Sequence, residues 1–121
     1  MMSKPLVTEN LALLYKEAAS RFGQLPAFAT RRDAQAWEPL SFNALYERGL
    51  NLATGLIHLG VAAREHVGLF ADNRVEWIIA DCGVQLCGAA DVPRGRDVTA
   101  SELEYIINHA GIKVAFVETE A

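Results

Sequence analysis

Two arginines in the loop at residues 94–97 are the side chains best suited to chemistry in this sequence. Arg94 and Arg96 carry guanidinium groups, which bind a carboxylate or a phosphate through two parallel hydrogen bonds. Their loop follows an apolar stretch, and the pair Asp72 and Asn73 follows another. Because ligands of open parallel sheets bind beyond the carboxyl ends of the strands, we expect an anion contact at Arg94 or Arg96.

The same turns also have a purely structural interpretation, which the sequence favours. In it, Asp72 and Asn73 cap a helix that starts at Arg74. The arginines of the later loop then pair with a neighbouring aspartate, either Asp91 or Asp97. Both interpretations remain open at this point.

The sequence contains none of the common catalytic signatures. The spacing from Gly83 to Gly88 resembles a phosphate-binding loop but lacks its lysine and hydroxyl residue. Neither a dinucleotide-binding fingerprint nor a Gly-x-Ser-x-Gly element is present. The histidines share no ligand spacing with each other or with Cys82 and Cys87. We therefore predict no catalytic and no metal-binding residue in these 121 residues.

Other conspicuous side chains are expected to pack. Cys82 and Cys87 lie on different sides of one predicted helix, so a mutual disulfide is geometrically poor and both are expected to be small buried residues. Trp37 and Trp77 are expected to fill space in the core. Asp91 lies within a predicted strand, where a carboxylate would be buried and paired, and the sequence does not name its partner.

A strand–helix–strand unit would position the two polar turns. Residues 66–71 and 89–92 are short apolar runs, and residues 75–87 carry apolar side chains at helical spacing until Gly88 stops the helix. Two such strands joined by one helix form a right-handed unit with parallel strands.

Before this unit the sequence predicts a helix and a hairpin. Apolar residues, beginning at Leu11, recur at helical steps over residues 11–22, with Thr8 or Asn10 as the cap and Gly23 at the C′ position. The hairpin has two short strands around a polar turn, at residues 27–30 and 37–40.

A long helix then begins at Ser41, a good N-cap, with an apolar face that reaches Leu59 and a stop at Gly60. Its interior glycines, Gly49 and Gly55, weaken it intrinsically and suggest close packing on a neighbour, with flexibility as the alternative.

The last segment repeats the pattern of helix and strand. Thr99 and Glu102 match a capping box, Gly111 ends the helix that they open, and residues 113–117 form a third apolar strand. From Ser41 onward, helices and strands alternate. This order predicts an α/β fold, a parallel sheet layered with helices as in flavodoxin-like βαβαβ units, with a short hairpin added.

Composition narrows the possible partners. The chain of 121 residues is 51% hydrophobic with a net charge of −4, which fits one packed domain and disfavours a nucleic-acid partner.

No secretory signal or membrane-spanning run is present, so we expect a cytoplasmic protein with at most peripheral membrane association. The chain ends four residues after the last strand, and we expect residues 1–121 to be the front part of something larger.

Several segments resemble the adenylate-forming superfamily of acyl-CoA synthetases, luciferases and peptide-synthetase adenylation domains. Residues 39–45 resemble its first core motif, residues 72–77 its short Asn- and Trp-containing element, and residues 86–93 its second core motif. The ending of the last motif is most similar to bacterial long-chain-fatty-acid–CoA ligases. The residues that carry these motifs are Ser41, Asn73, Trp77, Gly88, Pro93 and Gly95.

This resemblance implies a reaction and its cofactors. A fatty acid, ATP and Mg²⁺ give an acyl-adenylate and pyrophosphate, and CoA then accepts the acyl group. The phosphate loop, ribose-binding aspartate and catalytic lysine of the family lie downstream of the matched segments, so we expect these residues to be an inactive scaffold without bound cofactor.

The resemblance also implies partners and leaves alternatives. The expected partners are the remainder of the polypeptide and, in the complete enzyme, fatty acid, ATP and CoA, with a homodimer left open. The alternatives are a ligase of another acid in the same superfamily, or a stand-alone flavodoxin-like binding module.

Overall fold

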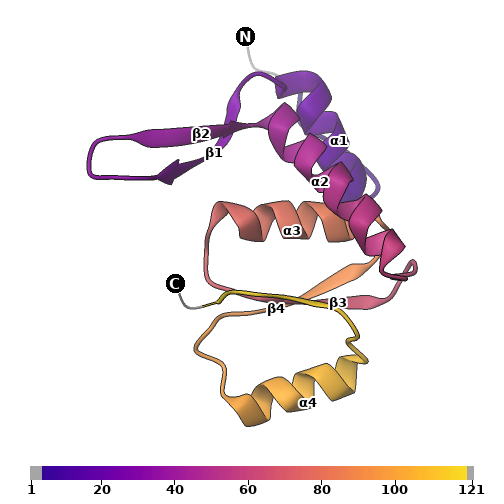
Figure 1. Ribbon diagram of the computed structural model, residues 1–121. Helices are drawn as coiled ribbons and strands as arrows, with labels where there is room; N and C mark the ends of the chain where they lie inside the picture. Colours follow the sequence, from indigo (N-terminus) through magenta and orange to yellow (C-terminus); the bar gives the residue numbers. More distant parts are fainter. Residues whose placement is uncertain (1–3, 120–121) are drawn as a thin grey trace.

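Three parallel strands with helices on both faces form the centre of the molecule (Figure 1). The computed structural model describes residues 4–119. Its elements in chain order are α1 (Leu11–Phe22), β1 (Pro26–Arg31), β2 (Trp37–Ser41), α2 (Phe42–His58), β3 (His66–Phe70), α3 (Val75–Leu86), β4 (Ala90–Arg94), α4 (Ala100–Ala110) and β5 (Ala115–Val117).

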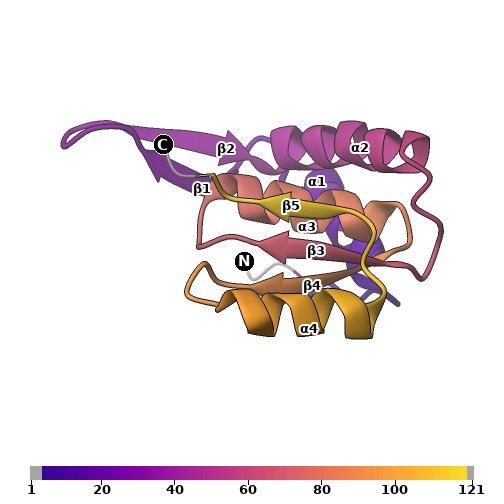
Figure 2. The same cartoon turned by 60° about the horizontal axis from the view of Figure 1, so that its bottom comes forward.

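The predicted parallel sheet is confirmed, with strand order β4-β3-β5. The ladder joins His66 to Ala90 and Phe70 to Arg94 on one side of β3, and Gly68 to Ala115 on the other. Helices α3 and α4 lie on opposite faces of the sheet (Figures 1 and 2). The chain therefore runs from β3 to β4 on one side and then crosses back to β5 on the other side of β3, which is the 2-1-3 strand order of a flavodoxin-like fold.

The core lies mainly on the α3 side of the sheet, where α1 and α2 cover α3 (Figure 1). One cluster joins the sheet to α2 and α3, and its buried members are Leu56, Val61, Val67, Val84 and Ala89. A second cluster contains Leu40, Leu45 and Cys82, and it lies between α2, α3 and the end of β2. Helix α4 has no buried residue, so this part of the chain covers the second face of the sheet only partly.

Helices α2 and α3 pack closely because glycines stand at their contact. A Cβ atom on Gly49 would collide with the Sγ atom of Cys82, a fully buried residue. A Cβ atom on Gly83 would lie 2.9 Å from the side chain of Leu52. The predicted close packing is thus confirmed at Gly49 and is wrong for Gly55, which has no atom within 4 Å of its Cβ position.

The predicted helix caps are largely confirmed. The side chain of Asn10 accepts a hydrogen bond from Leu13 N–H (2.9 Å), and the hydroxyl of Ser41 accepts one from Ala44 N–H (3.1 Å). Thr99 and Glu102 form the capping box that their spacing predicts. These local signals fix where α1, α2 and α4 begin.

Gly23 ends α1 for a different reason from the one expected. The C′ position normally has left-handed backbone, but Gly23 has φ −44° and ψ −43°. A Cβ atom at Gly23 would collide with the Asn43 side chain, and the Gly23 carbonyl accepts a hydrogen bond from Asn43 N–H (3.0 Å). The glycine therefore permits the close approach of the start of α2.

The hairpin is confirmed as an antiparallel pair, β1 with β2, that stands apart from the parallel sheet (Figure 1). Trp37 is 63% exposed, so its predicted packing role is wrong, and the Arg31 guanidinium lies 5.8 Å from the centre of its ring. The apolar faces of α1 and α2 are likewise shorter than expected, because Leu11 and Leu59 are exposed.

Strand β4 runs from Ala90 to Arg94, two residues beyond the predicted end, because β3 continues the ladder as far as Phe70. Pro93 lacks an N–H group, and it is tolerated because β4 is an edge strand within residues 4–119. Strand β5, in contrast, begins only at Ala115, later than the predicted start. No helix in the described part of the chain is long and apolar enough to span a membrane.

The two helix glycines of α2 give a matched test of the α2–α3 contact. Gly49→Ala should lower the free energy of unfolding by roughly 1–2 kcal/mol, because overpacking against buried Cys82 outweighs the gain in helix propensity. Gly55→Ala should raise it by up to about 1 kcal/mol, because its Cβ enters open space. Urea unfolding of both variants measures the difference, and equal effects would contradict this contact.

Candidate functional site at the carboxyl ends of the strands

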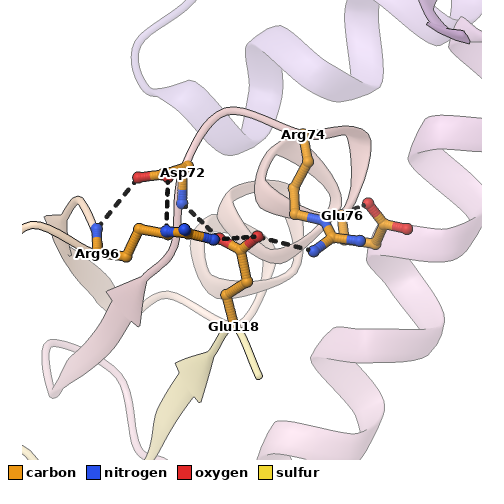
Figure 3. A network of polar contacts seen from close by, with 5 residues as sticks. All are labelled: Asp72, Arg74, Glu76, Arg96 and Glu118. Atoms are coloured by element: carbon orange, nitrogen blue, oxygen red, sulfur yellow. Dashed lines mark hydrogen bonds and ion pairs between the residues drawn. The ribbon is translucent and has the colours of Figure 1, made fainter. Parts of the chain in front are cut away.

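The polar turns after the three parallel strands meet at one edge of the sheet, as the sequence predicted for two of them. Asp72 follows β3, Arg96 follows β4, and Glu118 follows β5 (Figure 3). The strand order β4-β3-β5 corresponds to the 2-1-3 order of flavodoxin-like folds, in which the switch point lies between the first and third strands, here β3 and β5. Glu118 was not predicted as a site residue, because it lies just beyond the last predicted strand and belongs to no motif.

Arg96 pairs with two carboxylates at this edge, although its side chain remains largely exposed. Its Nε atom lies 3.3 Å from Asp72 Oδ2, and its backbone N–H donates to Asp72 Oδ1 (3.1 Å). Its Nη1 atom lies 4.0 Å from Glu118 Oε1. The predicted pairing of an arginine with Asp91 or Asp97 is therefore wrong.

The predicted capping of α3 by Asp72 and Asn73 is also wrong. The N-cap residue is Arg74, and no side chain forms a capping hydrogen bond there. The carboxylate of Asp72 is already bound to Arg96 and is directed away from the start of the helix (Figure 3).

Glu118 is the most enclosed member of the network, with 16% of its side chain exposed. Its Oε2 atom accepts a hydrogen bond from the backbone N–H of Asp72 (2.9 Å), and its Oε1 atom accepts one from Arg74 Nη1 (3.2 Å). Its own backbone N–H donates to the Phe70 carbonyl (3.2 Å), which continues the β3–β5 ladder. Glu118 therefore fastens the end of β5 to the start of α3.

Arg74 extends the network to Glu76, whose Oε2 atom lies 3.0 Å from Arg74 Nε. A hydrogen bond from its own backbone N–H, followed by the nearby Arg74 guanidinium, lowers the pKa of Glu76. Acidic and basic groups alternate along this edge in the order Glu76, Arg74, Glu118, Arg96 and Asp72 (Figure 3). Exposed pairs are individually weak, but a connected series holds its members in one geometry.

Arg94 differs from Arg96, because it forms no ion pair with any of residues 4–119. It ends β4 and lines a hollow of about 580 Å³. The motif residues expected at this edge line the same hollow: Asn73, Trp77, Pro93 and Gly95. A Cβ atom on Gly95 would lie 2.9 Å from Asp97 Oδ1, so glycine leaves room for the Asp97 side chain beside this hollow.

A larger hollow of about 700 Å³ lies between the hairpin and the start of α3. Trp77 lines both hollows and is partly buried, which agrees with its predicted packing role. Its lining combines the apolar residues Phe28, Ala29, Val75, Trp77 and Ile78 with polar and charged residues such as Arg31, Arg74 and Glu76. Of the remaining motif residues, Ser41 caps α2, and Gly88 ends α3 with φ +80°, a left-handed conformation suited to glycine.

A second polar cluster lies under α1 and supplies the partner of Asp91. The Tyr15 hydroxyl donates to Asp81 Oδ2, and Gln85 Nε2 donates to Asp91 Oδ1 (3.1 Å). Burial, and then a hydrogen bond to Asp81 and repulsion by its charge, raise the pKa of Asp91 to about 6. Burial is also the main cause that raises the pKa of the Tyr15 hydroxyl.

The described residues suit charge pairing better than bond-making chemistry. Burial raises the pKa of the Cys82 thiol to about 12, so it remains protonated at neutral pH, and its predicted packing role is confirmed. Cys87 is only half-buried. Among residues 4–119, no three His, Cys, Asp or Glu side chains are grouped to hold a metal ion.

Comparison with known sequences gives a consistent result. A family model described as AMP-binding enzyme matches residues 15–121. Human long-chain-fatty-acid–CoA ligase ACSBG2 is 34% identical over 106 residues, covering 88% of this chain and 16% of that protein. The chloroplastic long-chain-fatty-acid–[acyl-carrier-protein] ligase AEE15 of Arabidopsis thaliana is 39% identical over 71 residues, 59% of this chain and 10% of that protein. The chain thus spans about a sixth or less of the length of these relatives.

Solved structures share the fold. The N-terminal domain of FACL13 from Mycobacterium tuberculosis matches with a TM-score of 0.78 and 23% identity, over 89% of this chain and 26% of that one. The N-terminal subdomain of Klebsiella oxytoca NpsA matches with a TM-score of 0.81 and 16% identity, over 94% of this chain and 29% of that one.

Asp91 should give the stability of the protein a defined pH dependence. Its pKa is about 6 in the folded state, above the ordinary value of 3.8, so its stabilising contribution is full below about pH 4 and is lost as the pH rises through 6. Asp91→Asn keeps an acceptor for Gln85 and a donor for Asp81 without the charge. Above pH 6 this variant should be more stable than the wild type, and the advantage should vanish toward pH 4. Unfolding curves across this range test it; a difference independent of pH would contradict the assignment.

Proposed function

We propose that this chain, which belongs to the AMP-binding enzyme family, is the amino-terminal scaffold of a long-chain-fatty-acid–CoA ligase. The resemblance to adenylate-forming enzymes inferred from the sequence motifs is confirmed by the family match, and the α/β fold agrees with it. The fatty-acid branch is supported by the curated relatives, several of which are named long-chain-fatty-acid–CoA ligases.

The proposed reaction of the complete enzyme has two steps. A fatty acid reacts with ATP to give an acyl-adenylate and pyrophosphate, and the thiol of CoA then displaces AMP to give the acyl-CoA. ATP and CoA follow from the family, and Mg²⁺ is proposed as the partner of ATP. Residues 4–119 contain no grouping of metal ligands, so other parts of the polypeptide would hold the metal ion.

The observation that supports the scaffold role is that the polar side chains at the switch point pair with one another. Asp72, Arg74, Arg96 and Glu118 are bound to one another, so they hold strand ends and loops in place. Arg94 forms no ion pair within residues 4–119, whereas the charge of Arg96 is shared with Asp72 and Glu118, so the proposed anion contact is placed first at Arg94 and second at Arg96. The remainder of the polypeptide is the proposed partner of the hollows and the partly covered sheet face.

In a second candidate function the fatty acid is activated in the same way, but a different thiol accepts the acyl group. AEE15 is named as a ligase of acyl-carrier protein, so the acceptor in this protein is either CoA or a carrier protein. Assaying both acceptors with the same fatty acid separates these two candidates. A ligase of another acid, or a stand-alone binding module, would show no fatty-acid-dependent step at all.

The activity test compares two polypeptides. The longer protein that contains this chain should catalyse exchange of pyrophosphate into ATP that depends on a long-chain fatty acid, and should form acyl-CoA. The 121-residue chain should show neither activity, since its described residues supply no catalytic group. Exchange by the short chain would refute the scaffold role, and a longer protein that responds only to other acids would refute the fatty-acid assignment.

The role of Arg94 is tested in the same longer protein. Arg94→Ala should raise the KM for ATP or for CoA roughly tenfold, the loss of about 1.4 kcal/mol expected for one charged hydrogen bond. Arg32→Ala, a change at an exposed arginine of the hairpin turn, is the matched control and should leave both constants unchanged. Unchanged constants in the Arg94 variant would remove the anion contact.

A further inference from the structure

The carboxylate of Glu118 lies where donors from three separate segments converge. The backbone N–H of Asp72 comes from the turn after β3, Arg74 begins α3, and Arg96 belongs to the loop after β4 (Figure 3). Each oxygen of the carboxylate has its own set of donors. Oε2 accepts from Asp72 N–H at 2.9 Å, and Oε1 faces Arg74 at 3.2 Å and Arg96 at 4.0 Å.

This arrangement has the features of an anion-binding site. It combines a backbone N–H group with two guanidinium groups, at the position in a doubly wound sheet where ligands ordinarily bind. The bound carboxylate is largely enclosed, with 16% of the Glu118 side chain exposed, whereas the Arg74 and Arg96 side chains reach solvent. The donors thus surround the position of the Glu118 carboxylate.

We infer that the switch-point crevice is a carboxylate-binding site that this chain fills with its own Glu118, and that a small free carboxylate enters it when the Glu118 side chain is removed. The inference does not rest on the proposed function. It has a direct consequence for any larger protein: the position between Asp72 N–H, Arg74 and Arg96 is closed to an external carboxylate as long as Glu118 stays in place, because a tethered group has a high effective concentration. The hollow that Arg94 lines is separate, since Glu118 is not among its lining residues.

The surroundings favour a singly charged carboxylate over a phosphate. The carboxylates of Asp72 and Glu76 already neutralise part of the charge of Arg96 and Arg74. A dianion would therefore meet repulsion from both sides, whereas a planar monoanion with two oxygens reproduces the contacts of Glu118. Formate is the smallest probe with this chemistry.

The test is thermal unfolding of the full chain in sodium formate, with sodium chloride at equal ionic strength as the reference. Glu118→Ala should have a lower Tm than the wild type in chloride, and formate should restore several degrees in a saturable manner. The wild type should show no such response, because its crevice is filled. A Glu118→Ala chain that gains nothing from formate, whether or not it folds in chloride, overturns the inference.

Two further variants separate a specific site from a general effect of the salt. Glu118→Gln keeps a side chain in the crevice, so its Tm should not respond to formate. Glu102→Ala removes a carboxylate that accepts hydrogen bonds from Thr99 and forms no ion pair within residues 4–119, so it should not respond either. A response of either variant equal to that of Glu118→Ala would also overturn the inference.

Discussion

The burial of β3 is the constraint on which the rest of this structure depends. Its last four residues, 67–70, are buried, and it pairs with a parallel strand on each side. A strand in this position has no free edge, so its backbone N–H and C=O groups must be satisfied by both neighbours. Its side chains alternate between the two faces, so Val67 and Leu69 face α3 while Gly68 and Phe70 face α4.

The same register distributes the polar groups. Asp91 pairs with Val67 and therefore lies on the α3 face, where it meets Asp81 and Gln85. The polar residues that follow each strand emerge together at the carboxyl edge, because parallel strands all end there. Two arginines and three carboxylates consequently come within reach of one another, and they pair (Figure 3).

These pairings are the physical basis of the scaffold role proposed for this chain. The groups at the switch point stabilise the ends of the strands and the loops between them. The two faces of the sheet differ: α1, α2 and α3 pack on one side, and α4 covers the other without burying a residue of its own. The hollow beside the hairpin lies on the α3 side, where apolar and charged side chains are both exposed.

The sequence by itself determined the elements, their order and most of their caps. Helical spacing, the Thr99–Glu102 capping box and the Ser41 cap act over a few residues, and the alternation of helices with apolar strands is enough to predict a parallel sheet. The tertiary structure decided which charges pair. Arg96 binds Asp72 and Glu118 instead of its neighbours in sequence, and Asp91 finds Asp81 and Gln85.

It also decided which of two similar glycines lies at a helix contact. Gly49 faces Cys82 and Gly55 faces open space, although both interrupt the same helix. The physical reason is common to all these cases. Local propensities depend on residues three or four apart, whereas a partner is fixed only when strand register and helix packing bring distant segments to within a few ångströms of each other.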